Sequence, residues 1–211
     1  MNKFPAIIHD KPHFTIICGR KGSGKTNLTV KLLRSVWKGI YDSVVVISPT
    51  FLLQQNVWSQ IKPEGIRVYL QFRHDTIENL LTEQTQNRNK LLLLIDDVGE
   101  DVLRDVATRP LMHKLIANSR HLRTSIVWLA QKLTQIPTYA RANTDVFINF
   151  ASLSTRERQA LYDEVSICSL PAFTKMFNES TKEPYSTFCA SFQNGKLEYY
   201  VNLEKKIEVE D

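Results

Sequence analysis

The feature that most constrains this chain is the stretch GRKGSGKT over residues 19–26, which fits the pattern GxxxxGK[ST] at every fixed position. An apolar run over 13–18 precedes it, and the segment over 26–39 that follows places its leucines on one helical face. A strand, a glycine-rich turn and a helix in this order make a loop whose N–H groups converge on phosphate oxygens. The stretch therefore predicts a nucleotide-binding α/β fold.

The residue types of the loop also predict its ligands. Lys25 is expected to reach the β- and γ-phosphates, and the Thr26 hydroxyl is expected to bind Mg²⁺. ATP and Mg²⁺ are therefore the expected cofactors. The expected ATP-binding residues are Gly19, Gly22, Ser23, Gly24, Lys25 and Thr26.

A second candidate for the same site is KLLLLIDD over residues 90–97. Asp96, at the end of a buried strand, is placed to hold Mg²⁺ at the sheet edge. Asp97 follows where many hydrolytic proteins with this loop carry a Glu that polarises the attacking water. Asp is one methylene shorter than Glu, so Glu100 remains a substitute base. The alternative is that the two acids only cap the following turn.

The rest of the chain predicts a mainly parallel sheet flanked by helices. Continuous apolar runs, typical of strands buried on both faces, occur at 13–18, 43–48, 90–97, 124–130 and 144–150. Helical patterns separate several of these runs, at 26–39, 75–86 (with Asp75 as its cap) and 109–120. The C-terminal part predicts a helix over 154–165, capped by Ser154 and Glu157, and a β-hairpin over 185–202.

We expect one domain over residues 1–211, because the length allows one α/β domain and is short for two. Its core is expected over about 13–150, the C-terminal helix and hairpin over 151–203, and a frayed tail over 204–211. The hairpin is expected either to cover the core or to contact DNA or a capsid. The three cysteines, Cys18, Cys168 and Cys189, are expected to be buried thiols, since they are widely spaced among apolar residues.

Composition excludes some classes and leaves others open. No apolar run approaches the roughly 20 residues of a membrane helix, and the N-terminus lacks the apolar segment of a signal peptide. The formal charge of +5 fits a polyanionic partner only weakly, because distribution matters more than the sum.

The polar residues after 117 decide between classes of nucleotide-binding protein. If an added strand lies between the strand at 13–18 and the strand ending in Asp96, the chain belongs to the hydrolytic branch rather than to the kinases and GTPases. Gln131 would then contact the γ-phosphate or the water, although a Gln that closes a strand is unremarkable alone. Three arginines could reach the nucleotide site of a neighbouring subunit in a ring, namely Arg120, Arg123 and Arg141. The alternative for each of them taken alone is a solvated side chain that caps the end of a strand.

The order of these parts resembles one family. The loop GRKGSGKT, the strand LLLLIDDV, then SRHLRTSIVWLAQ, IPTYARANTD and VFINF are similar to the poxvirus-type genome-packaging ATPases of the FtsK/HerA superfamily, over roughly residues 13–150. The resemblance implies a homo-oligomeric ring that uses ATP and Mg²⁺ to push double-stranded DNA into a capsid. It also implies that Lys25 and Thr26, Asp96 and Asp97, and Gln131 form the site, with a trans arginine among the three candidates.

The same resemblance implies further expectations. The partners are duplex DNA and a capsid or portal-vertex protein, and the place is the host cytoplasm or viral factory and the virion vertex. Arg20 and Lys21 need not touch phosphates and would face DNA or a neighbouring subunit. Only about a dozen residues precede the first strand and no nuclease domain follows, so other elements would dock to the capsid. The alternatives are a nucleoside or nucleotide kinase and an ATP-dependent structural subunit.

Overall fold

The structure is a computed structural model that describes residues 4–9, 11–61, 66–98, 105–151, 154–193 and 195–209. Nine strands form one sheet: β1 (Phe14–Cys18), β2 (Ser43–Ile47), β3 (Ile66–Tyr69), β4 (Leu91–Asp96), β5 (Thr124–Ala130), β6 (Val146–Phe150), β7 (Thr187–Gln193), β8 (Lys196–Val201) and β9 (Lys205–Ile207). No helix among the described residues is long and apolar enough to cross a membrane.

The strand order is β3-β2-β4-β5-β1-β6-β7-β8-β9. The pairs from β3 to β6 are parallel, and those from β6 to β9 are antiparallel. The expected mainly parallel α/β sheet is thus confirmed, and the hairpin extends it. β5 lies between β1 and β4, which is the arrangement that distinguishes the hydrolytic branch.

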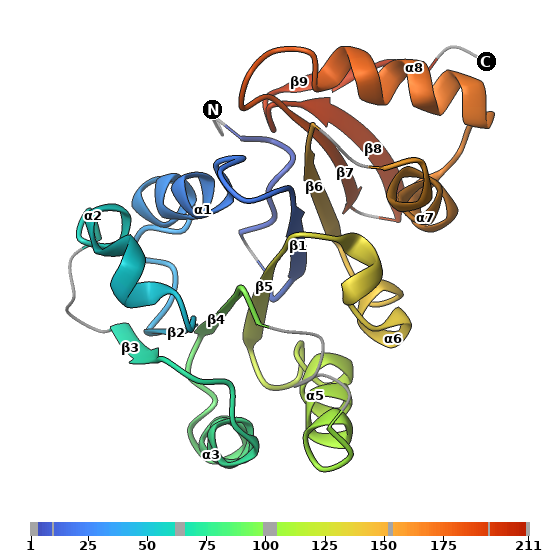
Figure 1. The fold of residues 1–211 in the computed structure, drawn as a ribbon. Coiled ribbons are helices and arrows are strands. Elements are labelled where there is room, and N and C mark those ends of the chain that lie inside the picture. The colour runs from blue at the N-terminus through green and yellow to red at the C-terminus, as the bar shows by residue number, and fades with distance from the viewer. Residues whose placement is uncertain are drawn as a thin grey trace.

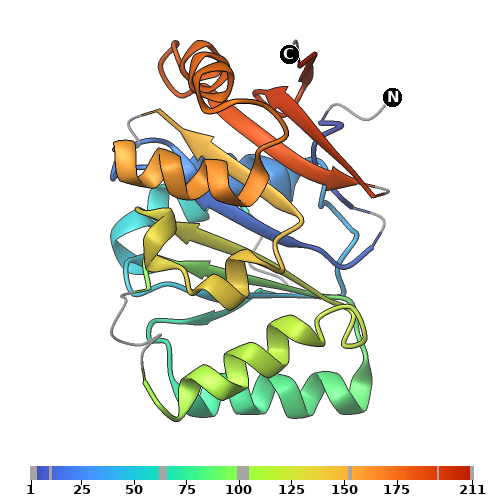
Figure 2. The ribbon, with the colours of Figure 1, turned by 90° about the vertical axis from the view of Figure 1, so that its right-hand side faces the viewer.

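Helices cover both faces of this sheet (Figure 1). One face is covered by α1 (Lys25–Arg34), α2 (Gln55–Trp58) and residues 4–9. The other face is covered by α3 (His74–Asn87), α5 (Thr108–Ala117), α6 (Thr138–Arg141), α7 (Thr155–Val165) and α8 (Leu170–Ser180). Figure 2 shows α3 and α5 lying side by side under the parallel strands.

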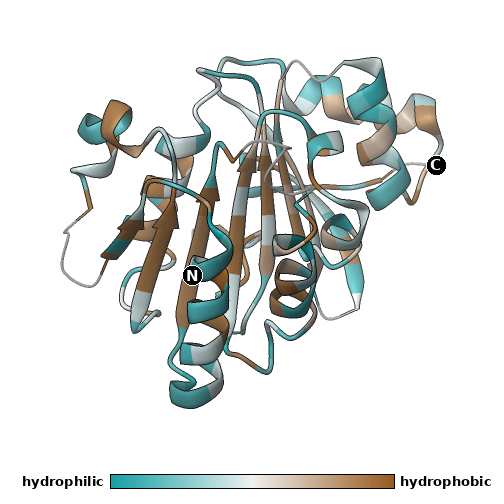
Figure 3. Ribbon diagram, turned by 60° about the horizontal axis from the view of Figure 1, so that its bottom comes forward, coloured by the Kyte–Doolittle hydropathy of each residue, from teal (hydrophilic) through white to brown (hydrophobic). Residues whose placement is uncertain are grey.

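The core is centred on β4 and β5, in which every residue is buried. Figure 3 shows these central strands as hydrophobic and the outer helix faces as hydrophilic. Burial on both faces explains why the two strands have continuous apolar sequences rather than alternating ones. Cys18 and Cys189 are buried as expected, in the clusters on the two faces of the sheet, whereas Cys168 is only half-buried. Burial raises the pKa of the Cys18 thiol to about 12.

Several boundaries differ from the sequence expectations. The helix after the glycine loop ends at Arg34 rather than near residue 39, because Trp37 turns back and donates from Nε1 to the Ile8 carbonyl at 3.4 Å. α3 begins at His74, so Asp75 lies in its first turn and does not cap it. Strand β3 and helix α8 were not expected.

The C-terminal part also needs two corrections. The tail expected to fray over 204–211 is wrong in part, because residues 205–207 form β9, which pairs with β8 and is stabilised by its ladder hydrogen bonds. Ser154 caps α7 by accepting from the Glu157 N–H, as expected. The Glu157 carboxylate, however, accepts from the Thr134 N–H at 3.0 Å instead of closing a capping box.

Candidate nucleotide site

The glycine loop joins the carboxyl end of β1 to α1. The Gly19 N–H donates to the Ala130 carbonyl at 3.1 Å, so the loop leaves the sheet beside the end of β5. A Cβ on Gly19 would lie 2.5 Å from Ser23 Oγ and 3.0 Å from Phe150 Cβ, so a side chain there would force both neighbours to shift. Gly24 has φ +101°, in the left-handed region that glycine enters without steric cost. The local sequence is therefore required by the backbone shape as well as by the expected ligand.

Lys25 lies at the first position of α1 and folds back over the loop. Its Nζ donates to the carbonyl oxygens of Gly19 at 2.6 Å and of Arg20 at 3.2 Å. Burial lowers the pKa of Lys25, and the nearby Asp96 carboxylate opposes that shift. The ammonium group is therefore held at the centre of the loop, where a phosphate group could replace its two carbonyl partners.

Asp96 is the last residue of β4 and is buried, with 2% of its surface exposed. Burial, followed by the repulsion of Asp97, raises the pKa of Asp96 to about 6, although Lys25 and a hydrogen bond from Ser48 act in the opposite direction. Ser48 Oγ donates to Asp96 Oδ2 at 3.3 Å. A buried carboxylate that is this poorly compensated is a site for a cation.

Asp97 and Gln131 meet across the ends of β4 and β5. Gln131 Nε2 donates to Asp97 Oδ1 at 2.9 Å. Asp97 adopts φ +53°, a left-handed conformation that is uncommon outside glycine and occurs at functional sites. Both side chains are exposed to the cleft described below. The carboxylate and the amide are bonded directly to each other, so one water molecule in the cleft could contact both.

Behind Asp96 lies a chain of hydroxyl groups that was not predicted from the sequence. Ser48 follows β2, and its Oγ lies 3.3 Å from Thr50 Oγ1, to which Gln54 Nε2 donates at 3.0 Å. β2 pairs with β4, so this chain reaches Asp96 from the neighbouring strand. The available signal was a polar residue that directly follows a buried strand, since such residues gather at one edge of a parallel sheet.

An open cleft of about 1180 Å³ runs along this edge of the sheet. Lys21 and the glycine loop lie in its middle, and Asp96, Asp97 and Gln131 lie along one side. The C-terminal part supplies other lining residues, which are Glu183, Pro184, Tyr185, Ser186, Thr187, Asn202 and Glu204. The cleft is thus shared between the parallel strands and the antiparallel extension.

Tyr185 is the most notable of these C-terminal residues. It precedes β7, whose first residue pairs with Phe150 at the carboxyl end of β6. The Tyr185 side chain is exposed, and its backbone has φ +63°. A Cβ built on Gly24 would lie 3.3 Å from its Cδ1, so the ring stands directly beside the glycine loop. Tyr185 was assigned to a strand from the sequence, whereas it lies in the loop before that strand.

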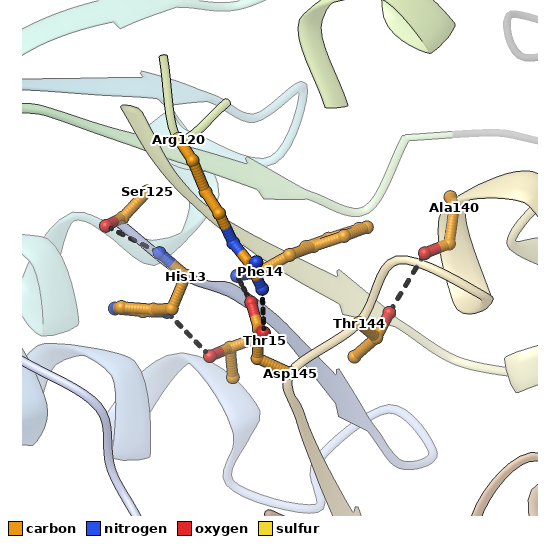
Figure 4. A network of polar contacts seen from close by, with 8 residues as sticks. All are labelled: His13, Phe14, Thr15, Arg120, Ser125, Ala140, Thr144 and Asp145. Carbon is orange, nitrogen blue, oxygen red and sulfur yellow. Dashed lines mark hydrogen bonds and ion pairs between the residues drawn. The ribbon is translucent and has the colours of Figure 1, made fainter. Parts of the chain in front are cut away.

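The three arginine candidates do not reach this cleft. Arg120 and Arg123 lie in the α5–β5 turn, at the opposite edge of the sheet. Figure 4 shows Arg120 extending to Asp145, where its Nη2 donates to Oδ1 at 2.9 Å. Arg141, in α6, forms an ion pair with Glu164 at 3.4 Å. The substitute base Glu100 lies outside the described residues.

The residues present fit a magnesium ion. A threonine hydroxyl and a carboxylate offer the oxygen ligands that Mg²⁺ prefers. Among the described residues, Ser48 is the hydrogen-bond donor to Asp96, so the buried carboxylate lacks a charged partner within bonding distance. Thr26 and Asp96 would hold the ion, which would neutralise charge on the terminal phosphates.

The sequence of this chain is similar to those of known proteins. A model of the family described as Poxvirus A32 protein matches residues 4–182. The DNA packaging protein OPG160 of Variola virus is 29% identical over 149 residues, which cover 66% of this chain and 53% of that protein. The uncharacterized protein L649 of Acanthamoeba polyphaga mimivirus is 28% identical over 167 residues, or 77% of this chain and 53% of that protein. This chain spans about half the length of these curated relatives.

Comparison with solved structures supports the fold. B204, the DNA-packaging ATPase of Sulfolobus Turreted Icosahedral Virus, superposes with a TM-score of 0.65. The match covers 94% of this chain and 100% of that chain at 15% identity. A likeness at this identity establishes a common architecture.

Proposed function

This chain belongs to the Poxvirus A32 protein family, and from that premise we propose that it is an ATPase that moves double-stranded DNA during genome packaging. One observation carries the hydrolytic part of the proposal, namely the hydrogen bond from Gln131 to Asp97 at the ends of β5 and β4. A water-holding pair of this kind beside a phosphate-binding loop suits hydrolysis. The names of OPG160 and B204 support DNA as the translocated substrate.

The chemistry follows from the order of groups along the cleft. Lys25 exchanges its two loop carbonyl partners for phosphate oxygens when the nucleotide binds. Asp97 accepts a proton from the attacking water, and the Gln131 amide fixes that water in line with the terminal phosphorus. Thr26 and Asp96 would hold a magnesium ion, which would supply electrostatic stabilisation of the phosphate charge.

The other end of the cleft is suited to the nucleotide base. Tyr185 lies beside Gly24 on the side of β6 and β7, whereas Asp96 and Gln131 lie on the side of β4 and β5. A triphosphate centred on the loop with its γ-phosphate toward Gln131 therefore extends its base toward Tyr185. An exposed aromatic ring offers a stacking surface for that base.

We further propose that the chain acts as a ring that docks to a capsid or portal vertex. Among the described residues that line the cleft, the cations are Lys21, Lys25 and Lys31, and none is an arginine. An arginine from a neighbouring subunit would supply the missing transition-state charge. Arg120, Arg123 and Arg141 remain the candidates for that role.

The test is ATP hydrolysis by the full chain with and without duplex DNA, together with oligomer mass in a non-hydrolysable ATP analogue. Duplex DNA should stimulate hydrolysis, and Lys25→Ala or Asp96→Ala should abolish it, whereas the exposed Lys38→Ala should not. Full activity in both site variants would overturn the proposal. ATP consumption that requires a nucleoside and ignores DNA would identify a kinase instead, a reading that the position of β5 disfavours.

A further inference from the structure

Two long stretches of this chain contain basic residues and no acid. Residues 106–144 contain six Lys or Arg and no Asp or Glu, so they carry +6 with histidines neutral. Residues 11–41, which include the glycine loop and α1, contain seven Lys or Arg and no Asp or Glu. A concentrated charge of one sign creates a local field that a scattered surplus does not. The stretch over 106–144 runs from α5 through β5 to α6.

Three cations of the 106–144 stretch and two from the connection before β4 gather at the edge of the sheet opposite the nucleotide cleft. The amino ends of β4, β5, β1 and β6 share that edge, because the four strands are parallel. Five exposed cations lie on the connections that lead into β4 and β5, and we call them the basic edge. They are Arg88 and Lys90 after α3, Lys114 in the last turn of α5, and Arg120 and Arg123 after it.

The strand register fixes the spacing of the basic edge. Leu91 pairs with Thr124, so Lys90 and Arg123 occupy neighbouring positions on adjacent strands. The Leu91 N–H donates to the Arg123 carbonyl at 3.1 Å, which ties the two connections together. Arg120 extends the row past β1 to β6 through Asp145 (Figure 4). Four strands about 4.8 Å apart make a rigid row about 14 Å long.

Two arginines of the basic edge occupy strained backbone positions. Arg88 and Arg123 each have φ +51°. In this left-handed region a residue with a Cβ costs about 1 kcal/mol or more relative to glycine. Gly or Asn would fit both turns at a lower cost in backbone strain. The backbone alone therefore does not explain why arginine occupies both positions.

Few acids offset the charge of the basic edge. Asp145 is held by Arg120 and also accepts from the Phe14 N–H at 2.8 Å. Asp42 accepts from the backbone N–H of Lys90 at 2.8 Å. No ion pair joins Arg88, Lys90, Lys114 or Arg123 to another residue in the described part of the chain. These cations therefore keep their charge available to a ligand.

We propose that the basic edge binds the phosphate backbone of duplex DNA, an assignment that rests on the proposed function. A duplex carries one negative charge per about 1.7 Å of its axis with both strands counted, so a segment as long as the row of about 14 Å carries roughly eight charges, part of which face the row. Exposed cations on a rigid row suit a backbone contact that does not depend on base sequence. Binding here leaves the nucleotide cleft, at the opposite edge, open to ATP.

The test compares two double variants of the full chain by binding to a short blunt duplex over a range of salt concentrations. R88N/K90Q removes two charges from the basic edge, and Asn at 88 keeps a residue that tolerates the left-handed backbone. K175Q/K205Q removes two exposed charges elsewhere. R88N/K90Q should weaken binding at least tenfold and reduce the salt slope by about two. Its ATP hydrolysis without DNA should equal that of the wild type.

Each outcome has a distinct meaning. Equal DNA affinity of R88N/K90Q and K175Q/K205Q would overturn the assignment while leaving DNA translocation intact. Failure of the wild type to bind duplex DNA would overturn the proposed function as well. A preference for single-stranded RNA or for anionic vesicles over the duplex would overturn the choice of ligand. If R88N/K90Q does not fold, K90Q/K114Q, which leaves both strained positions unchanged, gives the same comparison.

Discussion

The two edges of the parallel sheet use charge in opposite ways. At the carboxyl edge a buried carboxylate, Asp96, faces a half-buried lysine, and each depends on partners within a few ångströms. At the amino edge the cations are exposed and mostly unpaired. Buried charges are screened little by salt, whereas exposed ones are screened over about 8 Å at physiological ionic strength. One fold thereby separates charges that act over a short range from charges whose field extends into the solvent.

The largest expected effect is at the carboxyl edge. Gln131→Ala removes the amide that donates to Asp97 and should lower kcat for ATP hydrolysis by about 100-fold, the effect of losing one preorganised donor. The affinity for ATP and the salt dependence of duplex binding should stay as in the wild type. Steady-state hydrolysis and nucleotide titration measure the first two quantities.

A matched control for Gln131→Ala is Lys132→Ala, which changes the next residue, also exposed. That variant should hydrolyse ATP at the wild-type rate. A loss of DNA affinity in Gln131→Ala at constant kcat would mean that the two edges are not separate.

Asp96→Asn should separate stability from activity. Burial raises the pKa of Asp96 to about 6, so the folded state holds that proton more tightly than the unfolded state and loses stability as pH rises from about 4 to 6. Removing the charge should therefore raise the free energy of unfolding by on the order of 2 kcal/mol at pH 7 and by little at pH 4. Denaturant unfolding at both pH values measures this, while hydrolysis should be lost.

The exposed neighbour provides the comparison for Asp96→Asn. Asp97→Asn should also lower hydrolysis but change the unfolding free energy much less, because Asp97 is exposed. Equal stabilisation by both substitutions, or stabilisation that persists at pH 4, would contradict the assignment to the buried carboxylate.

Tyr185→Ala tests the base end of the cleft. Loss of the ring should raise KM for ATP by roughly tenfold with kcat nearly unchanged, since stacking on a base is worth about 1–3 kcal/mol. Tyr185→Phe keeps the ring and should behave like the wild type. A fall in kcat with unchanged KM would instead place Tyr185 near the reacting phosphate.

The smallest effect is expected at the amino edge. Asp145→Asn loses the charge that holds Arg120 but keeps an oxygen that accepts from Phe14. The free energy of unfolding should fall by about 1 kcal/mol, because Arg120 is largely exposed and an exposed ion pair contributes little. DNA affinity should rise slightly as one acid leaves the basic edge. A large loss of ATP hydrolysis in Asp145→Asn would contradict this purely local role of Asp145 in the connection before β6.

Much of the fold could be predicted because the central strands have a strong local signal. The run over 124–130 matches β5 at both ends, since a strand buried on both faces is apolar throughout. β3 was missed because it is a short edge strand that is only partly buried. β9 was missed because its three residues form a strand only by pairing with β8, which no local pattern reveals.

The candidate site likewise contains residues that could be predicted from the sequence and residues that could not. Lys25, Asp96 and Gln131 each lie at the start, at the end or directly after an element with a recognisable pattern, and the structure brings them to one cleft. Ser48 and Tyr185 come from other connections, and they join the site only because of strand order. Helix α8 was missed although the sequence carries signals for it, since Ser169 caps the helix and Pro171 lies in its first turn.

The position of β5 has a mechanical consequence. Its seven residues begin directly after Arg123 and end directly before Gln131. At about 3.3 Å per residue the strand is about 23 Å long. Strand β5 is hydrogen-bonded along both sides, to β4 and to β1, and has no exposed residue. Close-packed interiors transmit strain rather than absorb it. A force that acts on Arg123 at one end of this strand is therefore transmitted to Gln131 at the other end, beside the nucleotide cleft.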